Sequence, residues 1–102
     1  MFRDVITRDH GEPWPATGMT STRWLTIPVQ TVRIADLTAT QPGIYFHGLT
    51  ATNHVGGDHL PHVIAWHDRL YLEDGHHRAV AALLNGMTHM QARVLIVEEQ
   101  PA

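Results

Sequence analysis

Hydrophobic and polar residues alternate most clearly in the middle and at the end of the chain, and these patterns predict extended segments. Between residues 24 and 34 apolar side chains recur at close to every second position, and Pro28 interrupts the run. A proline at this point favours an edge strand or a bulged strand. Residues 35–40 suit a short turn or helix, and the apolar run at 91–97 predicts a last strand.

Two apolar runs, 63–66 and 69–72, are separated by two residues, and this spacing predicts a tight β-hairpin. A helix is expected directly afterwards, over about residues 75–85, because Ala and Leu dominate that stretch. Asp74 is placed to cap its N-terminus, and Gly86 suits a left-handed position at its C-terminus.

The remaining segments lack a sustained period. Residues 1–23 contain Gly, Pro and small polar residues and predict an irregular arm, and residues 50–62 have the composition of a binding loop. We therefore expect one domain at 24–98, with a tail at 99–102. The fold class expected is α+β (α/β), a small single domain with a mixed sheet and a helix after the hairpin.

Composition excludes several mechanisms. The 102 residues include no Cys and no Lys, which removes disulfides, cysteine nucleophiles, Schiff bases and lysine-bearing phosphate loops. The net charge of -3 argues against a general nucleic-acid surface. No apolar run is long enough to span a bilayer and no signal peptide is visible, so a soluble, cytoplasmic protein is expected. Nine histidines are the feature that needs explaining.

The segment from Asp74 to Arg78, Asp-Gly-His-His-Arg, is the candidate site. The free amides and the positive end of a helix dipole suit an anion, and an arginine adds a fork for phosphate oxygens. We expect Gly75, His76, His77 and Arg78 to bind a phosphate or nucleotide, and Asp74 and His76 to be catalytic. The purely structural alternative is that Asp74 caps the helix and Arg78 pairs with a nearby carboxylate.

This turn and its surroundings resemble the ParB/sulfiredoxin superfamily, in which a strand enters a Gly-x-x-Arg turn and an Ala-rich helix follows. The similarity covers residues 25–98 and includes Gln41 and Pro42, which are similar to that family's Gln-Pro box. The residues of this turn are most similar to those of the ADP-dependent serine kinase branch of the superfamily. The resemblance implies a ParB/sulfiredoxin-like fold, a nucleotide or phosphorylated small molecule as partner, and NTPase, phosphotransfer or nuclease activity, with Mg²⁺ as the ion expected if one takes part.

The chain departs from that superfamily in several respects. The catalytic Glu of the kinase branch has no clear counterpart, and Asp36 is only a positional match. His76 replaces the sulfiredoxin cysteine, so peroxiredoxin repair is excluded. The helix-turn-helix of partition proteins is absent from the sequence, so no sequence-specific DNA-binding module is expected.

Two other classes of function remain open. The first is a non-enzymatic module, encoded by a phage or mobile element, that binds and modulates a host protein. The second is a histidine-based metal protein using His54, His59 and His62 with Asp58, although Pro61 would break a helix aligning such ligands and no metal site is assigned. The three tryptophans are expected in the core or in docking contacts: Trp14, Trp24 and Trp66.

Overall fold

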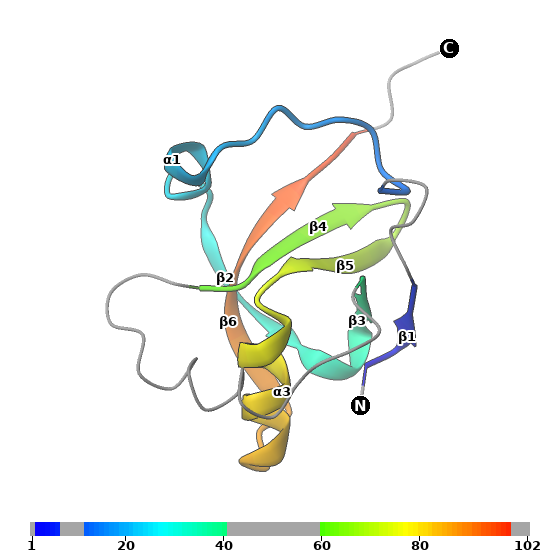
Figure 1. Cartoon of the computed structure of the whole chain (residues 1–102), viewed down its shortest axis with the longest axis vertical. Helices are drawn as coiled ribbons and strands as arrows, with labels where there is room; N and C mark the ends of the chain where they lie inside the picture. The colour runs from blue at the N-terminus through cyan, green and yellow to red at the C-terminus, as the bar shows by residue number, and fades with distance from the viewer. Residues whose placement is uncertain (1, 7–11, 41–59, 99–102) are drawn as a thin grey trace.

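The computed structural model describes residues 2–6, 12–40 and 60–98. In this part of the chain a six-stranded mixed sheet carries two helices, which confirms the α+β class with a mixed sheet (Figure 1). The strands are β1 (Asp4–Val5), β2 (Val29–Arg33), β3 (Leu37–Ala39), β4 (His62–Trp66), β5 (Arg69–Asp74) and β6 (His89–Ile96). The helices are α1 (Ser21–Trp24) and α3 (His76–Leu84), with a 3-10 turn at Ile34–Asp36.

The strand order is β1-β3-β5-β4-β6-β2. The antiparallel β4–β5 hairpin forms the centre, β3 runs parallel to β5, and β6 runs parallel to β4. The strand β2 closes one side by pairing antiparallel with β6, and the two-residue β1 closes the other by pairing parallel with β3. The last strand in sequence thus lies between two earlier ones.

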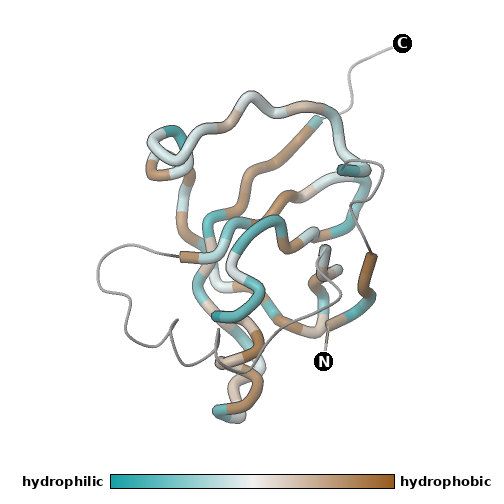
Figure 2. Tube along the Cα trace, viewed as in Figure 1, coloured by the Kyte–Doolittle hydropathy of each residue, from teal (hydrophilic) through white to brown (hydrophobic). Residues whose placement is uncertain are grey.

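Alternation along the strands sends apolar side chains to both faces of the sheet. On one face Val63 and Leu72 belong to a core to which Ala79 of α3 contributes. On the other face Ile64 and Tyr71 pack with Trp14 of the N-terminal arm and Trp24 of α1. Figure 1 shows the arm and α1 following the upper margin of the sheet and α3 below it, and Figure 2 shows apolar residues along β4 and β6.

The structure confirms the hairpin, the edge strand after Pro28 and the helix that follows the hairpin. Gly86 has a φ of 76° just past α3, as expected for its left-handed position. The cap prediction is wrong: Gly75, with φ 94°, occupies the N-cap position instead of Asp74. A left-handed residue is needed where β5 turns sharply into α3, and glycine adopts that conformation without a Cβ clash.

Two segments differ from the sequence prediction. Residues 35–40, expected as a turn or helix, form the end of the 3-10 turn and then β3, a buried three-residue strand. Its pairing with β5, more than 30 residues later, overrides the weak local preference. The arm predicted as irregular contains β1 and α1, and Thr20 caps α1 by accepting a hydrogen bond from the Arg23 amide. Most of the predicted loop 50–62 lies outside the described residues, as do Gln41 and Pro42.

The hairpin turn gives a first testable prediction. His67 and Asp68 have φ values of 50° and 59°, the left-handed pair of a type I′ turn. Glycine at position 68 removes a Cβ from an unfavourable conformation, so Asp68→Gly should raise the free energy of unfolding by about 0.5–1 kcal/mol. The change leaves His67, which stacks on Trp66 at a centroid distance of 3.8 Å, in place. Asp68→Ala should instead be destabilising in the same urea titration, and the opposite order would contradict this turn geometry.

Candidate functional site

The turn from Asp74 to Arg78 lies where β5 ends and α3 begins, at the place the sequence predicts. Gly75 is pressed against Pro61: a Cβ built on it would lie 2.8 Å from the Pro61 Cα and 2.8 Å from its Cβ. The glycine is therefore required by a close approach of the protein's own chain. From the sequence, by contrast, Gly75 is predicted to bind a phosphate.

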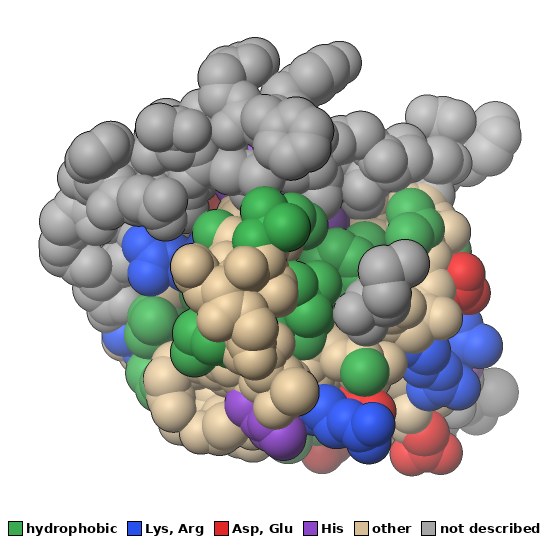
Figure 3. Space-filling view, turned by 90° about the horizontal axis from the view of Figure 1, so that it is seen from below, with side chains coloured by type: hydrophobic (Ala, Val, Ile, Leu, Met, Phe, Trp, Pro, Cys, Tyr) green, Lys and Arg blue, Asp and Glu red, His purple; other side chains and the backbone are tan. Residues whose placement is uncertain are grey.

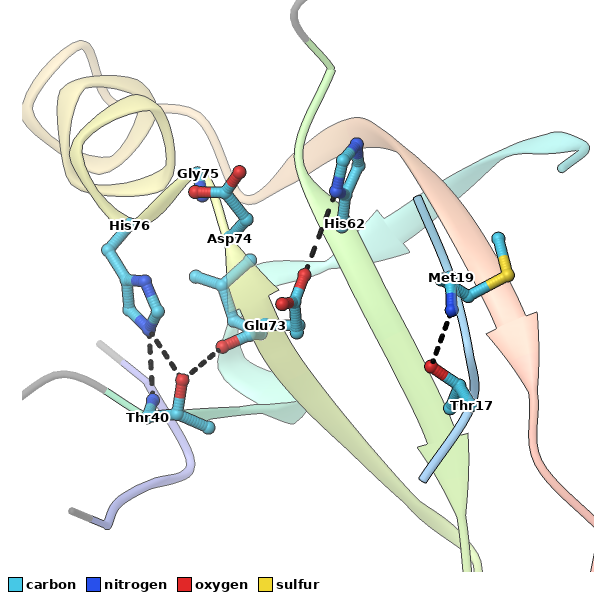
Figure 4. Close-up of polar contacts among 9 residues, drawn as sticks. Thr17, Met19, Thr40, His62, Glu73, Asp74, Gly75 and His76 are labelled. Atoms are coloured by element: carbon cyan, nitrogen blue, oxygen red, sulfur yellow. Dashed lines mark hydrogen bonds and ion pairs between the residues drawn. The ribbon is translucent and has the colours of Figure 1, made fainter. Parts of the chain in front are cut away.

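His76 points into the protein, as Figure 4 shows. Its side chain is 3% exposed, and its Nε2 accepts a hydrogen bond of 2.9 Å from the backbone amide of Thr40. The Thr40 hydroxyl lies 3.3 Å from the same nitrogen and donates to the Leu72 carbonyl at 2.7 Å. Because an amide donates to it, Nε2 carries no proton, and this buried nitrogen joins the end of β3 to the start of α3.

Asp74 is exposed and its Oδ1 accepts a 2.9 Å hydrogen bond from the Gly75 amide. A carboxylate thus already lies beside the first amide before α3, where an incoming anion would meet like charge. His77 and Arg78 are half-buried on the first turn of α3. The catalytic roles of Asp74 and His76 and the phosphate-binding roles of Gly75, His76, His77 and Arg78 stay predictions, as does Mg²⁺.

A second cluster lies on the arm face of the sheet, around His62. The Trp24 ring stacks on the His62 ring with centroids 4.1 Å apart and planes inclined by 7°. His62 Nδ1 lies 3.7 Å from a carboxylate oxygen of Glu73 on β5 (Figure 4). In this place His62 helps fix α1 over the sheet.

The histidine-based metal site considered from the sequence would use His54, His59 and His62 with Asp58. Of these four residues, His62 alone lies within the described part of the chain. Within residues 2–6, 12–40 and 60–98, no three His, Asp or Glu side chains gather in a way that could hold a metal ion. Trp14 and Trp24 are buried in the core of the arm face, as expected, and Trp66 packs at its edge.

Sequence reasoning missed the two residues that fix this turn, Thr40 and Pro61. Both are distant in sequence from α3, and Thr40 lies 36 residues from the histidine it contacts. Neither has a local signal of such a role. The one available hint was the glycine itself, which can mark close approach by any group, protein or ligand.

The geometry defines a small α+β protein in which Gly75 and His76 of the turn make contacts that hold the fold together. A profile of the family described as Antitoxin VapB-like matches residues 2–98. The chain belongs to the Antitoxin VapB-like family. Neither the curated proteins nor the solved structures include a significant match.

Family membership corrects the sequence-based identification. The resemblance to the ParB/sulfiredoxin superfamily is wrong, and with it the function inferred from it, nucleotide or phosphate binding with NTPase, phosphotransfer or nuclease activity. The resemblance depended on a strand, a Gly-x-x-Arg turn and an Ala-rich helix. The structure gives a different reason for that pattern, because Gly75 makes room for Pro61 and His76 holds Thr40.

A last finding concerns membranes. None of the helices in the described part of the chain has the length and apolar character needed to cross a bilayer.

Proposed function

We propose that this protein is an antitoxin that binds a cognate toxin protein and neutralises it without catalysis. The observation that carries the proposal is the match to the Antitoxin VapB-like family over residues 2–98. Of the classes of function that the sequence leaves open, this proposal agrees with one, a non-enzymatic module that binds another protein. A cytoplasmic location belongs to the same proposal.

The contacts at the turn support a binding role over catalysis. The groups best suited to acid–base chemistry are occupied within the fold: His76 accepts from the Thr40 amide, and Asp74 accepts from the Gly75 amide. The Nε2 atom of His76 could take up a proton from a substrate only if its contact with the Thr40 amide were broken.

The far end of α3 offers a surface suited to a protein partner. The helix is apolar from Ala79 to Leu84, yet Leu84 is 66% exposed and Met87, just beyond the helix, is 50% exposed. Val80 precedes Leu84 by one turn and is half-buried. Figure 3 shows hydrophobic side chains gathered at the face over α3. Exposed apolar patches of this kind mark interaction sites, and we assign toxin contact to this one.

The proposal predicts a growth phenotype. The toxin partner is first identified as a protein that arrests growth when it is expressed alone from an inducible promoter, and co-expression of this chain should then restore colony growth. Leu84→Asp should abolish the rescue, because a charge would be buried against the toxin. Arg78→Ala and Asp74→Ala should retain it, since neither side chain belongs to the apolar surface.

A matched control is Ile96→Asp, which introduces the same charge at a residue that is 68% exposed at the end of β6. It should rescue growth as the wild type does. Loss of rescue in Arg78→Ala with the protein still folded would contradict the non-catalytic assignment, and equal rescue by Leu84→Asp would remove α3 from the interface. Failure of the wild-type chain to restore growth in this pairing would contradict the proposed function.

A further inference from the structure

The C-terminal end of α3 carries the pair Asn85-Gly86, in which Asn85 is the C-cap residue. Both residues are exposed, and the space around Gly86 is open, because a Cβ built on it meets nothing within 4 Å. Asparagine is among the residues that heat damages most readily. An asparagine followed by glycine is especially reactive, since no side chain hinders attack by the glycine nitrogen on the asparagine side chain.

The hydrogen bonds at this helix end show what has to open before such an attack. The Gly86 amide donates to the Leu83 carbonyl at 3.0 Å, and the Asn85 Nδ2 donates to the Ala81 carbonyl at 2.9 Å. Both bonds belong to the exposed end of a helix, and helix ends open at the lowest free-energy cost in a fold. Opening of this last turn frees the Gly86 nitrogen to approach the Asn85 Cγ.

The sequence contains one other pair of this kind, Asp74-Gly75 at the opposite end of α3. Its glycine is enclosed, because a Cβ built on Gly75 would lie 2.8 Å from the Pro61 Cα. The turn joins β5 to α3, so it opens only when the packing of both elements is disturbed. A carboxylate also reacts more slowly than an amide in this chemistry. The structure therefore favours reaction at Asn85 over Asp74.

We propose that Asn85 is a deamidation site. The Gly86 nitrogen forms a bond to the Asn85 Cγ, the bond from Cγ to Nδ2 breaks, and Nδ2 leaves as ammonia together with the proton that the Gly86 nitrogen loses. Water then opens the resulting cyclic imide at either of its carbonyls. The product is aspartate or isoaspartate at position 85, with one more negative charge on the chain. Water is the co-reactant, and nothing is oxidised or reduced.

The product disturbs the end of α3 in two ways. The new carboxylate lies at the negative end of the helix dipole, and the last turn has no basic residue to compensate it. The Ala81 carbonyl also loses the amide donor that it has in the unmodified chain. The neighbours Leu84 and Met87 are the exposed apolar residues assigned above to toxin contact. Deamidation therefore weakens toxin binding with time, a consequence that rests on the proposed function, whereas the reaction itself does not.

Mass spectrometry of the full chain, incubated at physiological temperature and at neutral and mildly alkaline pH, tests the reaction. Cleavage by trypsin after arginine gives the peptide 79–93, which contains Asn85, and the peptide 70–78, which contains Asp74. Conversion at Asn85 should be on the order of tenfold or more faster than isoaspartate formation at Asp74, and it should accelerate as the pH rises. Asn85→Gln, the matched control, should stay unmodified, because its longer side chain disfavours the cyclic imide.

Two results would overturn the deamidation site. The first is a peptide 79–93 that stays unchanged in the folded chain while a synthetic peptide of the same sequence reacts. The second is isoaspartate formation at Asp74 as fast as conversion at Asn85. Circular dichroism during the incubation establishes that the chain remains folded.

Toxin affinity tests the consequence. Asn85→Asp reproduces one product and should raise the Kd of the toxin complex several-fold above that of Asn85→Gln, which alters the same cap without adding charge. Equal Kd values for the two variants would overturn the effect on binding. A wild-type chain that binds no toxin would contradict the proposed function instead, and the conversion of Asn85 in the isolated chain would still decide whether the deamidation site exists.

Discussion

Gly75→Ala is expected to lower the free energy of unfolding by about 2–4 kcal/mol. Two costs combine. The alanine would have to keep a φ of 94°, which disfavours a Cβ, and the methyl group would lie 2.8 Å from the Cα of Pro61. Because the Pro61 contact involves backbone, neither chain segment can move aside easily. Urea denaturation followed by circular dichroism measures the change.

Gly86 supplies the matched control for this prediction. It also has a positive φ, 76°, but a Cβ placed there meets nothing within 4 Å. Gly86→Ala should therefore cost only about 1–2 kcal/mol, the conformational part alone. Equal losses for the two variants would show that the approach of Pro61 does not limit the turn, and the structural explanation of Gly75 would then be wrong.

His76→Ala is expected to reduce stability by about 2–4 kcal/mol, since it leaves the buried Thr40 amide without its acceptor and opens a cavity under α3. His76→Gln offers an amide oxygen to the same donor and should recover part of the loss. His77→Ala, at the half-buried neighbouring position, should cost less than about 1 kcal/mol. In a domain of this size each kcal/mol corresponds to roughly 4–8 °C in Tm.

The two histidines also separate the structural role from a catalytic one. If toxin neutralisation follows stability, His76→Gln should restore rescue of growth in proportion to the fraction folded. If His76→Ala were as stable as the wild type, the contact with Thr40 would not be what selects histidine at this position. The acid–base role predicted from the sequence would then regain support.

Much of the fold could be predicted where the signal is local. The β4–β5 hairpin follows from two apolar runs with a two-residue gap, and α3 follows from its Ala and Leu content. The strand β3 could not be predicted, because three residues carry little local preference and their pairing partner in β5 is distant in sequence. The same holds for β1, a two-residue strand whose partner β3 lies more than 30 residues later in the sequence.

The candidate site differs from the strands, because the contacts of its turn come from distant parts of the chain. The sequence identified a special turn at Gly75 correctly but could not say what approaches it. A glycine that admits phosphate and a glycine that admits proline look the same in a sequence, and a histidine that accepts from a buried amide looks like a catalytic one. The distinguishing partners, Pro61 and Thr40, are brought to α3 by the fold of the sheet.

The position of β6 between β4 and β2 has a consequence for synthesis of the protein. Thr31 of β2 and its partner Gln91 of β6 are 60 residues apart, so at ~5–20 residues per second β2 waits about 3–12 seconds for its neighbour. During that time β2 lacks its sheet partner, and β4 lacks one of its two partners. The nascent chain can complete its sheet only after β6 has left the ribosome, which makes this interval the one in which chaperones would matter most.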